Sequence, residues 1–104
     1  MKKVIFSYAA EADLEEIADY ISADNSARAL SFIRELRESC SLLAAFPLSC
    51  PLVPRYEATG IRRMVHGRYL IFYRVGKDRT EIIHVLNGAM DYEPILFPSP
   101  GNEA

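Results

Sequence analysis

The sequence predicts an α+β fold in which a short N-terminal strand and a helical hairpin pack on an antiparallel sheet of three to four strands. Two observations support this fold. Apolar residues recur at helical spacing over two consecutive segments of the first half. Strand-forming residues then fill three segments between residues 61 and 86, and turn-forming residues separate these at hairpin length. The expected element order is therefore β-α-α-β-β-β.

The first two elements are a strand over residues 4–8 (VIFSY) and a helix over about 10–22. The helix is indicated by an apolar stripe at spacings of three and four, which comprises Leu14, Ile17, Ala18 and Ile21. Acidic residues crowd its first turns, where the helix dipole favours negative charge.

A second amphipathic helix follows after the break Asp24-Asn25-Ser26, which offers a choice of N-caps. Its stripe again has spacings of three and four, and comprises Ala29, Phe32, Ile33, Leu36, Cys40 and Leu43. Pro47 ends it, because a helix rarely continues into the residue before proline. Two such helices with a short link form an αα-hairpin, in which neither helix buries its stripe alone.

Residues 47–60 contain three prolines and a glycine and predict an ordered connecting loop. Three strands follow, over 61–65, 68–75 and 80–86, and they form an antiparallel meander. The middle strand is apolar on both faces over Leu70–Tyr73. One face is therefore expected against the helical hairpin, and the other needs cover from a tail, a partner or a second copy.

The length of 104 residues predicts one domain, over 1–97, with a flexible C-terminal tail over 98–104. Half the residues are hydrophobic and a quarter are charged, which is typical of a soluble globular protein. No apolar run approaches the ~20 residues that span a bilayer, and the N-terminal apolar stretch is too short for a signal peptide. We therefore expect a cytoplasmic protein.

Few residues suggest metal or nucleophilic chemistry. Cys40 and Cys50 are too few and too widely spaced for a zinc site, and both are expected to be reduced, with a disulfide as the alternative. His66 and His84 lie on different predicted strands and alone make a poor metal site. A phosphate-binding glycine loop and a nucleophile–histidine order are absent from the sequence. We expect no cofactor, no metal and no catalytic residue.

Charge is distributed unevenly along the chain, although the net charge is only −2. Residues 1–52 carry five Lys/Arg against eight Asp/Glu, whereas residues 55–79 carry seven basic residues against two acidic ones. The basic segment favours an acidic partner. The alternative is that these arginines form the solvated face of a sheet.

Six short sequence motifs, in this order, resemble those of the toxins of the RelE/ParE superfamily, on the ParE side. They span nearly the whole chain: A-D-L-E-E-I-A-D-Y-I (12–21), N-S-x-x-A-x-x-F (25–32), L-x-x-x-P (43–47), G-I-R (60–62), Y-L-I-F-Y-R-V (69–75) and I-x-x-V-L-x-G-x-x-D (82–91). The resemblance implies the toxin of a type II toxin–antitoxin system. It also implies a cognate antitoxin that neutralises the toxin with an acidic, amphipathic C-terminal segment.

The superfamily divides by chemistry. RelE-type members are ribosome-dependent mRNA endonucleases without a metal, which use clustered Lys, Arg, His or Tyr side chains for proton transfer and charge stabilisation. ParE-type members lack that cluster and poison DNA gyrase. The positions that align with the RelE cluster hold Leu70, Ala89 or Met90, and Leu96, with Tyr92 close to the last. The resemblance therefore implies a non-catalytic gyrase inhibitor.

Two alternatives stay open. An RNA-cleaving toxin is the first, because Arg62, Arg68, Arg74 and His84 are present. The second is a weakened toxin that only binds antitoxin. Many ParE-type toxins read V-L-H-G-x-R-D at the last strand, whereas this chain has Asn87 in place of the histidine and Met90 in place of the arginine.

The predicted antitoxin- or target-binding residues come from the basic segment and from the end of the last strand: Arg62, Arg63, Arg68, Arg74, His84, Asn87, Met90, Asp91 and Tyr92. The uncovered sheet face and the groove of the helical hairpin are expected to anchor an antitoxin helix, with strand addition at an open edge as another mode. No sequence-specific nucleic-acid binding is expected. Residues 82–96 are thus interpreted as a binding edge that leads into a tail.

Overall fold

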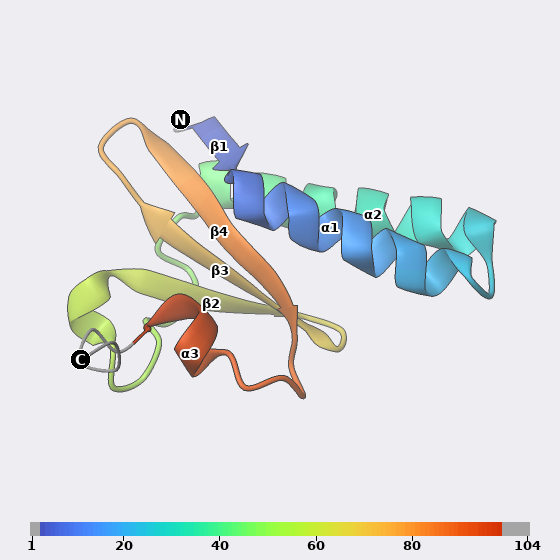
Figure 1. Cartoon of the computed structure of the whole chain (residues 1–104). Helices are drawn as coiled ribbons and strands as arrows, with labels where there is room; N and C mark the ends of the chain where they lie inside the picture. The colour runs from blue at the N-terminus through green and yellow to red at the C-terminus, as the bar shows by residue number, and fades with distance from the viewer. Residues whose placement is uncertain (1–2, 99–104) are drawn as a thin grey trace.

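A computed structural model describes residues 3–98 (Figure 1), so the predicted tail over 98–104 lies outside the described residues after Pro98. The elements are β1 (Lys3–Phe6), α1 (Tyr8–Ser22), α2 (Ser26–Ser41), the 3-10 turns η1 (Leu42–Ala44) and η2 (Glu57–Thr59), β2 (Ile61–His66), β3 (Tyr69–Val75), β4 (Arg79–Asn87) and α3 (Glu93–Leu96). This order confirms the predicted β-α-α-β-β-β fold and adds one short helix. Within residues 3–98, no helix is both long and apolar enough to cross a membrane.

The four strands form one sheet in the order β1-β4-β3-β2. β2, β3 and β4 make the predicted antiparallel meander. β1 lies at the far edge and runs parallel to β4, with Lys3 opposite Arg79 and Phe6 opposite Ile82. The sheet is therefore mixed, and not antiparallel throughout as predicted, because the residue pattern of a strand does not encode the direction of its neighbour.

Capping residues set the helix boundaries. The first strand ends at Phe6, before the predicted Tyr8, because the Ser7 hydroxyl accepts a hydrogen bond from the Ala10 N–H at 3.0 Å and donates to the Ile83 carbonyl at 2.8 Å. Asn25 caps α2 by accepting from the Arg28 N–H at 3.0 Å. α2 ends at Ser41 instead of running to Pro47, and η1 continues the chain as a tighter turn.

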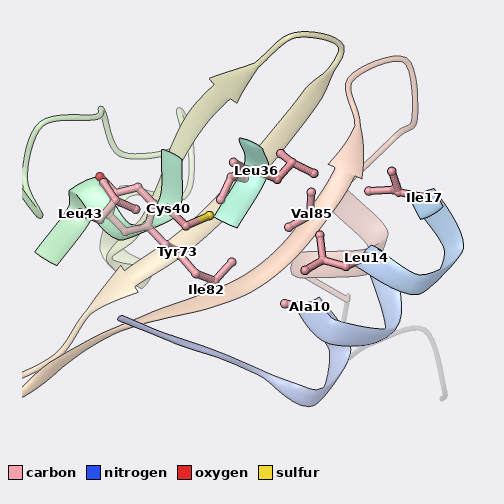
Figure 2. Close-up of a cluster of buried hydrophobic side chains, with 10 residues drawn as sticks. Ala10, Leu14, Ile17, Leu36, Cys40, Leu43, Tyr73, Ile82 and Val85 are labelled. Carbon is pink, nitrogen blue, oxygen red and sulfur yellow. The ribbon is translucent and has the colours of Figure 1, made fainter. Parts of the chain in front are cut away.

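One core lies between the helical hairpin and the sheet (Figure 2). Its buried members are Ala10, Leu14, Ile17, Leu36, Cys40, Leu43, Ile71, Tyr73, Ile82 and Val85. Burial raises the pKa of the Cys40 thiol to about 12, so this thiol stays protonated and behaves as a small apolar residue. Cys40 and Cys50 are both free in the structure.

A second apolar cluster covers the opposite face of the sheet. Its buried members are Val53, Ile61, Phe72 and Leu86, and the partly buried residues around it include Tyr56, Tyr92, Leu96 and Phe97. The Tyr56 and Phe97 rings stack with centroids 3.8 Å apart, and Tyr92 lies 4.8 Å from Phe72. The loop after Pro51 and the C-terminal segment therefore cover this face of the sheet. Of the three covers that the sequence leaves open (a tail, a partner or a second copy), the structure shows the tail.

Candidate binding site

The carboxyl half of β4 depends on α1 for a hydrogen-bond partner. A bulge in the β3–β4 pairing places Phe72 opposite His84 and Tyr73 opposite Ile82, and β1 ends opposite Ile82. Beyond the end of β1, Asp13 on α1 supplies the hydrogen-bond acceptor for β4. Its Oδ2 accepts from the Val85 N–H at 2.9 Å and lies 2.7 Å from His84 Nδ1. This carboxylate joins α1 to the sheet where the strand ladder ends.

A slot of about 310 Å³ opens beside this contact, between α1 and the end of β4. Its lining comprises Asp13, Glu16, Ile17, Tyr20, Tyr69, Val85, Leu86, Asn87 and Met90. Tyr20 is 78% exposed and Met90 is 47% exposed, so large side chains of a partner can reach both. The charged residues of the slot are acids, which makes it suited to apolar or cationic groups and unfavourable for anions.

The turn after β4 has a defined geometry. Asn87 Oδ1 accepts from the Ala89 N–H at 2.9 Å, and the Asn87 carbonyl accepts from the Met90 N–H at 3.0 Å. The Gly88 N–H donates to the Arg68 carbonyl at 2.7 Å, and a Cβ at this glycine would lie only 3.1 Å from that oxygen. Asn87 and Gly88 therefore shape the turn that presents Met90 to the slot.

The basic residues of the predicted site do not gather on one surface. Arg62 Nη1 donates to the Cys50 carbonyl at 2.6 Å and holds the connecting loop, whereas Arg63 Nη1 donates to the Tyr92 hydroxyl at 3.2 Å. Arg68 is exposed at the β2–β3 turn, and Arg74 is exposed near the other end of β3.

The remaining predicted residues separate into two places. Asn87 and Met90 line the slot, next to the half-buried His84, which is held by Asp13. Tyr92 lies over the second apolar cluster, and Asp91 Oδ1 accepts from the Glu93 N–H at 3.4 Å as α3 begins. The structure thus brings part of the predicted site together at the end of β4 and places Arg63 and Tyr92 on the opposite sheet face.

Two of the positions that align with the nuclease residues of RelE lie together on one face of the sheet, and both hold leucines. Leu70 and Leu96 both pack around the second cluster, and Tyr92 joins them with its hydroxyl bonded to Arg63. Proton transfer at a phosphate needs a base and an acid with cations beside them. Next to the two leucines this face offers the Arg63–Tyr92 pair, while the hydroxyl of Tyr56 is engaged with Glu93 at 3.1 Å. Within residues 3–98, no group of three or more His, Cys, Asp or Glu could hold a metal ion.

A larger groove of about 640 Å³ runs between the two helices. Its apolar lining comprises Leu14, Ala18, Ala29, Leu30 and Ile33, and its charged lining comprises Glu11, Glu15, Arg34, Arg37 and Glu38. Leu30 is 70% exposed. The Arg37 guanidinium bonds to Glu11 at 2.7 Å across the helices and lowers the pKa of that carboxyl. The groove is thus apolar between charged rims.

Sequence reasoning missed the α1 wall of the slot. Asp13, Glu16 and Tyr20 contribute to it from one side of α1, and their spacing of three and four residues was visible in the sequence. From the sequence alone, the acids of this helix are interpreted only through the helix dipole, because nothing local shows that the end of β4 lies beside them. The spacing is present in the sequence, but it identifies one wall of the slot only when the packing of α1 against β4 is known.

Comparisons with known proteins agree with this architecture. Residues 4–92 match the family described as ParE toxin of type II toxin-antitoxin system, parDE. The chain is 35% identical over 92 residues to Toxin ParE1 of Caulobacter vibrioides, a match that covers 88% of this chain and 94% of that toxin. Its fold is similar to a solved structure titled "Chromosomal ParDE TA system from P. aeruginosa", with a TM-score of 0.72 and 21% sequence identity, over 84% of this chain and 96% of that one. The chain therefore belongs to the ParE family of toxins of type II toxin–antitoxin systems.

Proposed function

We propose that this ParE-family toxin inhibits DNA gyrase in the cytoplasm by binding, without catalysing a reaction, and that a cognate antitoxin neutralises it. The observation that carries the non-catalytic part is the apolar packing of Leu70 and Leu96 on the sheet face where RelE-type toxins hold their reactive side chains. A phosphodiester placed there would meet leucines beside the Arg63–Tyr92 pair, which brings a single cation where cleavage needs several charged and proton-transferring groups.

The slot at the end of β4 is the proposed contact with the target. It combines exposed aromatic and thioether surface with carboxylates, a set of groups that suits an apolar or cationic anchor of a protein partner. The Met90 side chain lies at its rim and is 47% exposed.

Supercoiling and DNA-cleavage assays with purified gyrase test this proposal. The wild-type toxin should reduce supercoiling and accumulate cleaved DNA. Met90→Asp should raise the concentration needed by about tenfold, as loss of one interface anchor does. Ile95→Asp is the matched control, because Ile95 is 41% exposed and does not line the slot, and it should behave as wild type. Normal supercoiling with saturating wild-type toxin would reject gyrase as the target.

One contact favours a second candidate function. The Arg63–Tyr92 pair sets a cation beside a phenol on the sheet face, as RNA cleavage would require in part. Primer extension on translating ribosomes distinguishes this function from gyrase inhibition. Codon-positioned cuts that Tyr92→Phe abolishes would support a nuclease of RelE type. A chain that binds antitoxin, spares gyrase and cuts no mRNA would be the weakened toxin.

The groove of the helical hairpin is the proposed antitoxin site. An amphipathic helix presents an apolar stripe with charged flanks, and the groove offers an apolar floor with Glu11, Arg34 and Arg37 at its rims. The exposed Leu30 is suited to contact such a stripe.

Titration with the antitoxin encoded beside the toxin gene tests this site. Leu30→Asp should weaken the complex by about a hundredfold, because it sets a carboxylate against apolar surface. Leu42→Asp is the control, since Leu42 is 64% exposed and lies outside the groove. Equal affinities of the two variants would place the antitoxin elsewhere on the toxin.

A further inference from the structure

Four basic side chains gather at the end of the sheet that lies away from the tip of the helical hairpin. Lys3 of β1 is opposite Arg79 of β4, and Arg74 of β3 is opposite Glu81, so the strand register brings them to the β3–β4 turn, which carries Lys77. All four are exposed. Figure 1 shows the start of β1 beside this turn, with the hairpin projecting to the other side. We call Lys3, Arg74, Lys77 and Arg79 the basic tip.

The cations of the basic tip are available to a partner. Among residues 3–98, Arg28, Arg37 and Arg55 form ion pairs, and His84 contacts Asp13. In the same part of the chain, none of these pairs includes a residue of the basic tip, although Asp78 and Glu81 are close in sequence. The local net charge is therefore positive, and the charges are directed to solvent.

The helical hairpin, which projects away from the basic tip, carries a net negative charge. The segment 8–41, which forms the helical hairpin, carries eight Asp/Glu against three arginines. A polyanion would therefore be repelled by the hairpin and attracted to the basic tip, so that it meets the protein in one orientation.

The basic tip offers charge without an apolar anchor. The exposed large apolar residues lie in α1, α2, the segment 42–48, β2 and the C-terminal segment, and none lies in β1, β3, β4 or the turn between β3 and β4. The four side chains of the basic tip thus offer an acidic peptide no apolar contact and single-stranded nucleic acid no ring on which to stack. A double-stranded backbone needs neither, because its binding rests on phosphate charge.

We propose that the basic tip binds the phosphate backbone of double-stranded DNA without reading its sequence. This contact is independent of gyrase and of the antitoxin groove. Four lysine and arginine side chains can neutralise at most four phosphates, so the logarithm of affinity should fall with the logarithm of salt with a slope no steeper than about −3.6. Binding should be weak at physiological salt and clear at low salt.

Fluorescence anisotropy with a labelled duplex of about 20 base pairs tests the proposal over a salt titration from about 20 to 200 mM NaCl. The test variant is Lys77→Glu/Arg79→Glu. The matched control is Arg34→Glu/Arg68→Glu, which makes the same change in net charge at exposed positions away from the basic tip. Circular dichroism verifies that both variants fold.

Wild type should bind with the expected salt slope, the test variant should bind at least about tenfold more weakly, and the control should stay within about threefold of wild type. A single strand of equal length should bind more weakly than the duplex. The proposal is overturned if wild type leaves the duplex unbound at the lowest salt, if both variants lose equally, or if an acidic helical peptide or the single strand binds the tip more tightly than the duplex.

Discussion

The hydrogen bonds of the Asp13 carboxylate beside the slot are expected to contribute measurably to the stability of the fold. Asp13→Ala would leave the N–H of Val85, a residue only 2% exposed, without its acceptor, and would release His84 Nδ1. An unsatisfied buried donor costs about 1–3 kcal/mol and a lost hydrogen bond about 1 kcal/mol. Alanine returns about 0.5 kcal/mol of helix propensity. The free energy of unfolding should therefore fall by about 2–3 kcal/mol.

Urea unfolding followed by far-UV circular dichroism measures this loss. With a slope near 1 kcal/mol per molar urea, the midpoint should drop by about 2–3 M. Asp13→Asn keeps one acceptor oxygen and should lose about half as much. Glu16→Ala changes another acid of the slot, one turn further along α1 and exposed, and should stay within about 0.5 kcal/mol of wild type. If Asp13→Ala loses no more than Glu16→Ala, the carboxylate does not hold α1 to β4.

Three further predictions concern the rest of the chain. Arg55 has φ +74° after Pro54, a conformation that favours glycine, so Arg55→Gly should be more stable than Arg55→Ala by about 1 kcal/mol in thermal unfolding, and equal melting temperatures would contradict the strain. The Thr80 hydroxyl is buried without a hydrogen-bond partner among the described residues. Thr80→Val should therefore raise the unfolding free energy by about 1 kcal/mol, whereas Thr80→Ser, which keeps the hydroxyl, should give no gain. Arg37 lowers the pKa of Glu11 from 4.5, so their pairing stabilises the fold above that pH and the effect is lost as the pH falls through the lowered pKa. Glu11→Gln should cost at most about 0.5 kcal/mol at neutral pH and nothing near pH 2, and a pH-independent cost would refute the ionic origin.

The helices and the meander were predictable because their information is local. The stripe that contains Leu14 and Ile17 and the strand formers of 69–75 act through neighbours in sequence, and the structure confirms both. The short helix α3 was missed because four residues with a proline among them carry no periodicity.

The candidate binding site was predictable only in part, because it depends on pairings between distant segments. Asn87 and Met90 were identified from the strand end, but their partners Asp13 and Tyr20 come from α1. The seven basic residues of 55–79 looked like one strip, yet a two-residue alternation and two turns distribute them over both faces and both ends of the sheet.

The parallel pairing of β1 with β4 has a consequence for synthesis on the ribosome. Ser7 and Ile83 are hydrogen-bonded across 76 positions, so the N-terminal strand and the start of α1 wait for nearly the whole chain before their partners exist. A nascent chain that stops before β4 holds the helical hairpin without Ile82 and Val85 beneath it. Folding of this toxin is thus a late event of translation, and an unfinished chain exposes apolar helix surface in place of a finished slot.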